Sequence, residues 1–181
     1  VLHAADIGIG LARAIRAALV DGVVGLLVAL GHRLPPWGSL VIEARGLAES
    51  GVRELNLIAQ DLTEYGMEWK YRESLETLLP ELCKIEGLDW IRLHYVYPDQ
   101  FSDELLEIIA REPKIVKYLD MPIQHTSTRV LASMNRRLTK EKLFEVVTKL
   151  RARIPGIVFR TSIIVGFPGE TDDEFDELYQ D

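Results

Sequence analysis

The chain has 181 residues, a net charge of −7 and a mean hydropathy of +0.05, which fit one globular domain with a substantial core. The acidic balance argues against a broad nucleic-acid surface. A single cysteine, Cys83, excludes an internal disulfide and any zinc or iron–sulfur site built from several thiolates of this chain, and it favours a reducing, cytoplasmic location.

The first 34 residues are rich in Ala, Val, Leu and Gly, but Arg13, Arg16 and Asp21 interrupt them. The longest charge-free apolar stretch falls short of the roughly 20 residues that span a bilayer. No small-residue cleavage site of a signal peptide follows. We therefore expect no membrane role for this segment.

Regular α/β alternation begins at Ser39, which can cap a helix whose C-terminal glycine is Gly51. A buried strand follows over residues 54–61. The next helix, which ends near Gly87, contains Pro80, which is tolerable if Thr77 is the N-cap and the proline lies in the first turn. The pattern predicts two strand–helix units in a row.

Residues 90–98 predict the next strand, and Ser102 opens a helix that stops before Pro113. A further strand over 115–125 is ended by a proline near its close, and helical spacing then resumes, with Thr139 as a plausible cap. These segments repeat the strand–helix order.

The last strand, over residues 157–165, runs into a Gly-Phe-Pro-Gly turn and a helix with the Thr171/Glu174 spacing of a capping box. Gly166 and Gly169 place no Cβ in the way, so backbone N–H groups there can approach a ligand closely. An ordinary tight turn between strand and helix is the alternative for this segment taken alone.

Strands that alternate with helices, without hairpin signals, predict a parallel α/β sheet whose ligand lies at the carboxyl ends of the strands. Any one polar residue there has a plainer explanation, such as a turn cap for Asp61, a loop histidine for His125 or a surface position for Arg160. Together the residues at the strand ends and within the last strand form the candidate site: Gln60, Asp61, Tyr97, Asp99, Gln124, His125, Arg160, Thr161, Gly166, Phe167 and Gly169.

Four ordered segments, AQDLTEYG, HYVYPDQFSDELLEII, YLDMPIQHTSTRVLASMNRR and IVFRTSIIVGFPGETDDEF, closely resemble the radical-SAM methylthiotransferases. The resemblance covers about residues 40–181. The YPD of 97–99 and the DMPIQH of 120–125 are more similar to the RimO type, which modifies an aspartate of a small-subunit ribosomal protein, than to the MiaB type, which modifies tRNA adenosine.

The resemblance implies a partial (β/α) barrel, truncated, that holds S-adenosylmethionine beside a [4Fe-4S] cluster. By motif position it implies these contacts: Gln60 and Asp61 at the methionine end, Gln124 and His125 in the shared cofactor and substrate cavity, Arg136 at the methionine carboxylate, Arg160 and Thr161 at the ribose or carboxylate, and the turn Gly166, Phe167 and Gly169 at the adenine.

The chain departs from this family in one respect, because the Cys-x-x-x-Cys-x-x-Cys loop expected before Ser39 is missing. Residues 1–38 instead form an atypical apolar segment, explained either by a reading-frame shift in the source gene or by a replacement helix. We expect this segment to pack poorly or as an added helix, with residues 39–181 as the barrel core. Cys83 lies in a predicted helix away from the site.

These observations predict no metal ligands and no cluster in this chain. It is then a fragment inactive as a methylthiotransferase, and a non-catalytic α/β binding scaffold or a MiaB-type fragment is the alternative. Its implied partner is a small-subunit ribosomal protein.

Overall fold

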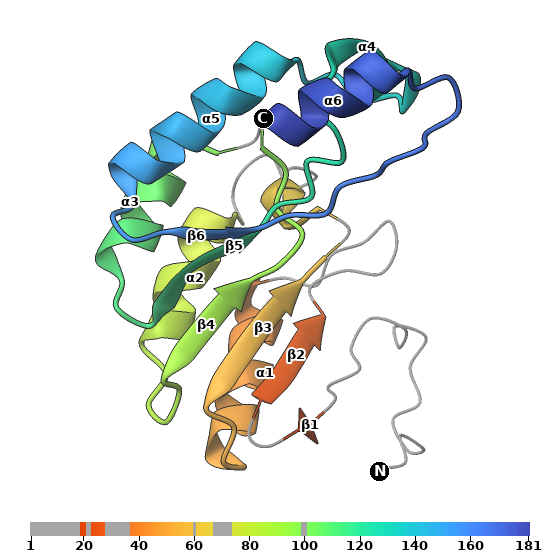
Figure 1. Cartoon of the computed structure of the whole chain (residues 1–181). Helices are drawn as coiled ribbons and strands as arrows, with labels where there is room; N and C mark the ends of the chain where they lie inside the picture. The colour runs from red at the N-terminus through yellow and green to blue at the C-terminus, as the bar shows by residue number, and fades with distance from the viewer. Residues whose placement is uncertain (1–18, 21–22, 28–36, 60, 67–73, 99–100) are drawn as a thin grey trace.

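The computed structural model describes residues 19–20, 23–27, 37–59, 61–66, 74–98 and 101–181 (Figure 1). Within this part the strands form a single sheet whose spatial order is the chain order. They are β1 (Leu19–Val20), β2 (Val23–Leu27), β3 (Glu54–Ile58), β4 (Trp90–Leu93), β5 (Ile115–Asp120) and β6 (Val158–Arg160). From β2 to β6 every neighbouring pair is parallel, which confirms the predicted α/β class, and only β1 is antiparallel.

The connections between the strands carry the helices: α1 (Trp37–Glu49), the 3₁₀ turn η1 (Leu62–Glu64), α2 (Leu75–Cys83), α3 (Asp103–Arg111), α4 (Thr128–Ser133), α5 (Lys140–Arg153) and α6 (Asp172–Gln180). Figure 1 shows α1 and α2 behind the sheet, and α1 packs on α2, α2 on α3, and α3 on α5. Among the described helices, none has the length and apolar character that crossing a bilayer requires.

The core lies between this helical layer and one face of the sheet. Leu55, Leu57, Ile91, Leu93 and Leu119 are fully buried at alternate strand positions and join the leucines of α2 in one cluster. Successive strand residues point to opposite faces, so the intervening residues line the other face. That second face is polar, as described below.

Local signals in the sequence set most helix starts. The Ser102 hydroxyl accepts a hydrogen bond from the Leu105 N–H at 3.0 Å, and Thr139 caps α5 in the same way. Thr171 and Glu174 form the predicted capping box of α6. Gly51 has φ +100°, as the glycine after a helix end requires.

Two helix predictions were wrong in detail. Helix α1 begins at Trp37, two residues before the expected cap at Ser39. Helix α2 begins at Leu75, with Ser74 rather than Thr77 at the N-cap position and without a side-chain cap bond, so Pro80 lies in the helix interior and not in the first turn. The helix tolerates the missing N–H there because leucines of α2 are buried in the core.

The expectation that residues 1–38 pack poorly or as an added helix was wrong for Val23–Leu27. These residues form β2, which runs parallel to β3 with Val23 opposite Glu54 and Leu27 opposite Ile58. A short VVGLL run fits a strand because two β-branched residues begin it and its backbone can complete the ladder of β3. The final strand is shorter than predicted and ends at Arg160.

Candidate functional site

Backbone hydrogen bonds beyond the ends of the strands join the carboxyl edge of the sheet. The donor and acceptor pairs are Leu62 N to Tyr95 O at 2.9 Å, Val96 N to Asp120 O at 3.0 Å, and Gln124 N to Ser162 O at 2.9 Å. Gln124 also pairs with Ile163 in an isolated parallel bridge. The predicted strand ends therefore meet at one edge, which we call the rim.

A cavity of about 520 Å³ opens at the rim, within the size range of small-molecule sites. Its lining comes from three segments that are far apart in the chain: Gln124, then Ser133, Met134, Asn135 and Arg136, then Ile164 and Phe167. Amide and guanidinium groups thus share one cavity with apolar side chains. Such a lining suits a ligand with one charged end and one apolar or aromatic end.

Gln124 enters this cavity from a left-handed backbone conformation, with φ +70°. Within the described chain, the other non-glycine residues with positive φ are Tyr95 and Asn135, and Asn135 lines the cavity too. Backbone strain of this kind concentrates at ligand sites, where the surrounding structure enforces it. Here the two hydrogen bonds that Gln124 makes with Ser162 and Ile164 hold it.

The end of α4 places Arg136 at the cavity. Asn135 has φ +58°, its N–H donates to Ala132 O at 3.0 Å, and the Arg136 N–H donates to Leu131 O at 2.8 Å. These two bonds form a Schellman motif with Asn135 at C′. The Arg136 guanidinium then lies 4.8 Å from the ring centroid of Tyr97 and donates a short hydrogen bond to its hydroxyl.

The Gly-Phe-Pro-Gly turn, whose Phe167 lines the cavity, forms another of its walls. Gly166 and Gly169 both have positive φ, at +73° and +86°, which explains the glycines. Glu170 closes the turn, since its Oε2 accepts from the Phe167 N–H at 2.9 Å and its own N–H donates to Phe167 O at 2.8 Å. Arg129 donates to Gly169 O at 2.7 Å from the start of α4.

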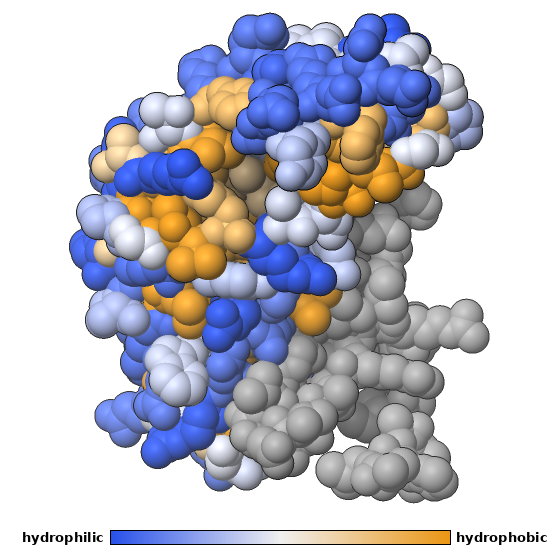
Figure 2. All heavy atoms as spheres, in the orientation of Figure 1, coloured by the Kyte–Doolittle hydropathy of each residue, from blue (hydrophilic) through white to orange (hydrophobic). Residues whose placement is uncertain are grey.

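The surface of this wall is apolar. Ile163, Ile164 and Val165 are 44%, 40% and 58% exposed. Figure 2 shows hydrophobic surface gathered beneath α6. Because Ile164 also lines the cavity, a ligand seated there would remove apolar surface from water.

His125, expected in the same cavity, is fully buried and does not line it. Its Nδ1 accepts a hydrogen bond from the Ser127 N–H at 2.9 Å, and its Nε2 lies 3.6 Å from Glu170 Oε1. The histidine therefore lies behind the Gly-Phe-Pro-Gly turn and not in the lining of the cavity.

Arg160 and Thr161 are both engaged with the protein. Arg160 Nη1 donates to Asp120 Oδ1 at 2.9 Å, and this hydrogen bond raises the pKa of the guanidinium above its usual value. The Thr161 hydroxyl accepts from the Ile123 N–H at 3.1 Å. Arg160 is more than half exposed, whereas the Asp120 side chain is buried.

Asp120 belongs to a chain of polar contacts across the open face of the sheet. His94 Nδ1 lies 3.4 Å from Asp120 Oδ2 and its ring meets Tyr118 edge-on, with centroids 6.0 Å apart. Arg92 lies 5.0 Å from the Tyr118 centroid and donates to Glu54 Oε1 at 2.7 Å. The negative charges of Asp120 and Glu54 are balanced by the positive charges of Arg160 and Arg92, so this face is polar without a strong net charge.

Asp61 caps a turn, which is the plainer of the two explanations that its sequence position allows. Its carboxylate accepts from the Thr63 N–H at 2.9 Å at the start of η1. Gln60 and Asp99, the other candidates at these strand ends, lie outside the described residues.

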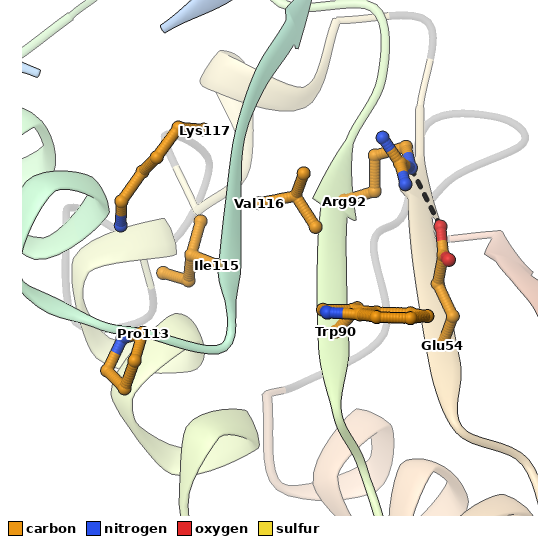
Figure 3. Close-up of a pocket in the computed structure, with 7 residues that line it drawn as sticks. All are labelled: Glu54, Trp90, Arg92, Pro113, Ile115, Val116 and Lys117. Atoms are coloured by element: carbon orange, nitrogen blue, oxygen red, sulfur yellow. Dashed lines mark hydrogen bonds and ion pairs between the residues drawn. The ribbon is translucent and has the colours of Figure 1, made fainter. Parts of the chain in front are cut away.

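A second cavity, of about 270 Å³, lies at the amino ends of the strands (Figure 3). Glu54, Trp90 and Ile115, the first residues of β3, β4 and β5, are among its lining. Figure 3 shows the Glu54–Arg92 ion pair on one side and Lys117 on the far side of β5. Ligands of parallel α/β sheets bind at the carboxyl ends, so the rim cavity is the candidate site.

The residues of the chain do not fit a [4Fe-4S] cluster, which requires several thiolates. Cys83, the one cysteine, is half-buried on α2, where burial and the nearby Glu112 raise its pKa to about 11. No group of three or more His, Cys, Asp or Glu side chains among the described residues is arranged to hold a metal ion. The rim residues do fit a charged and aromatic small molecule.

Sequence reasoning missed three residues that shape the site. Asn135 had a detectable signal, because asparagine after a helix end favours the left-handed conformation. Asp120 and Glu170 lie in the matched motifs, but Arg160, the partner of Asp120, and His125, which faces Glu170, are far from them in the sequence. Only the folded chain shows what they contact.

The family model of the radical SAM superfamily matches residues 32–181. The chain belongs to this superfamily.

Its curated relatives are more specific. The chain is 53% identical over 150 residues to the ribosomal protein uS12 methylthiotransferase RimO of Citrifermentans bemidjiense, covering 83% of this chain and 34% of that protein. It is 55% identical over 147 residues to the RimO of an Anaeromyxobacter species, covering 81% and 31%. The chain thus spans about a third of the length of these relatives.

Solved structures support the fold. The radical S-adenosylmethionine methyltransferase TsrM of Kitasatospora setae superposes with a TM-score of 0.62 at 18% identity, covering 81% of this chain and 26% of that one. The archaeal Elp3 of Methanocaldococcus infernus gives 0.54 at 14% identity, covering 90% and 42%. The predicted partial barrel of the radical-SAM type is confirmed.

Proposed function

We propose that this chain is the S-adenosylmethionine-binding part of a RimO-type enzyme, which adds a methylthio group to an aspartate of ribosomal protein uS12. The observation that carries the proposal is the rim cavity, where Gln124, Arg136 and Phe167 meet as the family resemblance implies. The similarity to RimO proteins over most of the chain supports the substrate. A ribosomal substrate makes the cytoplasm the place of action.

The cavity matches the chemistry of this cofactor at both ends. The Arg136 guanidinium, held by Tyr97, can pair with the methionine carboxylate, and the Gln124 amide can hydrogen-bond the amino-acid end or the ribose. Phe167 and Ile164 offer apolar contact to the adenine, beside backbone groups of the glycine turn.

Arg160 and Thr161 support the floor of the cavity through contacts within the chain. Arg160 holds the buried Asp120, and Thr161 fixes the Ile123 N–H, so both keep the strand ends in register beneath the cavity. Arg160 uses one guanidinium nitrogen for this bond and the Thr161 hydroxyl only accepts, so both side chains keep donors for a ribose contact.

We further propose that the 181-residue chain binds the cofactor without cleaving it. Reductive cleavage in this superfamily takes its electron from a [4Fe-4S] cluster, and one cysteine cannot supply the thiolates that hold it. Ground-state affinity does not replace that electron. A binding scaffold is therefore the second candidate, favoured by the single cysteine.

Calorimetry with S-adenosylmethionine tests the binding. Arg136→Ala should weaken binding by about 1–3 kcal/mol, the size of a hydrogen bond to a charged group. Arg137→Ala, which removes the same charge from an exposed neighbour, should leave the affinity unchanged. Absence of binding to the unmutated chain would refute the cofactor site, and equal losses in both variants would reduce the role of Arg136 to general charge.

Anaerobic reconstitution with iron, sulfide and a low-potential reductant tests the second part. We expect no stoichiometric cluster and no 5′-deoxyadenosine from this polypeptide. Production of 5′-deoxyadenosine would contradict the assignment of the chain as a binding fragment.

A further inference from the structure

The strongest feature outside the cavity lining is His125, a fully buried histidine directly behind the glycine turn. Its Nδ1 accepts the Ser127 N–H at 2.9 Å, at the residue that caps α4. A ring nitrogen that accepts a hydrogen bond carries no proton, so in the neutral ring the proton lies on Nε2. Ser127 thereby selects one tautomer and aims an N–H donor away from α4.

Among the described residues, this donor has no hydrogen-bond partner and Glu170 is its acidic neighbour. His125 Nε2 is buried, and Glu170 Oε1 lies 3.6 Å from it, beyond hydrogen-bond range. The Glu170 side chain is only 4% exposed, so water has little access to the pair. A buried donor without a partner is costly, and a small shift of either side chain would form a charge-assisted bond.

Glu170 connects this donor to the cavity wall. Its other oxygen, Oε2, accepts the Phe167 N–H at 2.9 Å, and Phe167 lines the cavity. One carboxylate therefore faces the histidine with one oxygen and fixes the turn with the other. Displacing the carboxylate would release the Phe167 backbone.

We propose that His125 is a positioning residue for the rim cavity. Its Nε2–H, 3.6 Å from Oε1, attracts the Glu170 carboxylate and thereby favours the conformation of the turn, Phe167 to Glu170, that receives the adenine end of the ligand. This role deepens the proposed function and rests on it for the identity of the ligand. The contact between His125 and the turn stands on the geometry alone.

Two variants separate the donor at Nε2 from the acceptor at Nδ1. His125→Gln places an amide N–H near the Nε2 position and can still donate to Glu170. His125→Asn places an amide oxygen near the Nδ1 position, so it keeps the bond from Ser127 and loses the donor. A histidine that only supports the α4 cap through Nδ1 predicts the opposite order, with asparagine the better replacement. Because glutamine also matches the volume of histidine more closely than asparagine does, Glu170→Gln, which leaves His125 in place, separates loss of the donor from loss of packing.

The first measurement needs no ligand. In the full 181-residue chain, amide exchange of Phe167 should become about 10- to 100-fold faster in Glu170→Gln and in His125→Asn, because a bond to a charged acceptor is weakened. His125→Gln should stay within about threefold of the unmutated chain. An imidazole ¹⁵N–¹H correlation should show the proton of His125 on Nε2.

The second measurement is S-adenosylmethionine affinity by calorimetry. We expect a loss of about tenfold or more in His125→Asn and near-normal affinity in His125→Gln. If the unmutated chain does not bind, the proposed function fails, while the amide exchange still decides the role of His125. Equal Phe167 exchange in both histidine variants, or a proton on Nδ1, would overturn the positioning role.

Discussion

The left-handed backbone at Asn135 should control both the stability of the rim and its affinity for ligand. The Schellman motif at the end of α4 requires φ near the observed +58° at this residue. Asparagine and glycine tolerate that conformation, whereas a β-branched residue does not. Asn135→Val should therefore strain or unwind the motif, and Asn135→Gly should preserve it.

The expected magnitude follows from the backbone alone. A left-handed conformation costs an ordinary L-residue about 1–2 kcal/mol, and in a chain of this size that lowers the thermal midpoint by roughly 2–8 °C. Both variants lack the asparagine amide, so a comparison between them cancels any direct contact of that amide with a ligand. The difference between Asn135→Val and Asn135→Gly therefore measures the effect of the backbone conformation, and with it the position of Arg136.

Thermal unfolding and calorimetry with S-adenosylmethionine measure the two effects. Asn135→Val should melt below Asn135→Gly and bind about tenfold more weakly, because Arg136 at the C″ position moves with the motif. Equal midpoints and equal affinities in the two variants would refute the argument that this motif places the arginine.

Three further predictions concern other parts of the fold. The hydrogen bond from Arg129 holds the pKa of Glu174 far below its usual 4.5. The stability that Glu174 contributes is therefore fully present above pH 4.5 and is progressively lost as the pH falls from there toward the lowered pKa. The stability difference between the unmutated chain and Glu174→Gln should thus shrink in acid. With a pKa of about 11 against an ordinary 9.0, Cys83 should react with iodoacetamide at pH 8 about 100-fold more slowly in the folded chain than in urea. Pro80→Ala should raise the thermal midpoint by restoring a helical N–H, with a gain of about 1–3 kcal/mol; a lower midpoint would mean that ring packing dominates.

Features fixed by near neighbours in the sequence could be predicted. The caps at Ser102, Thr139 and Thr171 bond to amides three residues ahead, and the structure has all three. The parallel pairing from β2 to β6 followed from the strand–helix alternation, because strands joined by helices pair in parallel. The meeting of the strand ends at one rim is a consequence of that parallel pairing.

Features that depend on distant partners could not be predicted. The ion pair of Arg160 with Asp120, forty residues away, could not be read from the sequence, and the ligand role of Arg160 stays a prediction. The family resemblance placed both Gln124 and His125 in the cavity by motif position, but the chain turns at Gln124, which has positive φ, and only Gln124 lines the cavity.

The same distinction separates binding from redox chemistry in this chain. The rim cavity is built from residues 124–167, all downstream of the place where the family resemblance sets the cluster loop. Strand β2 completes the sheet beside β3 without any cysteine, since the ladder needs only backbone groups and the cluster needs thiolates. The fold and the rim cavity therefore do not depend on the thiolates that a cluster needs. Cofactor affinity and cofactor cleavage are independent measurements on this protein, and we expect the first without the second.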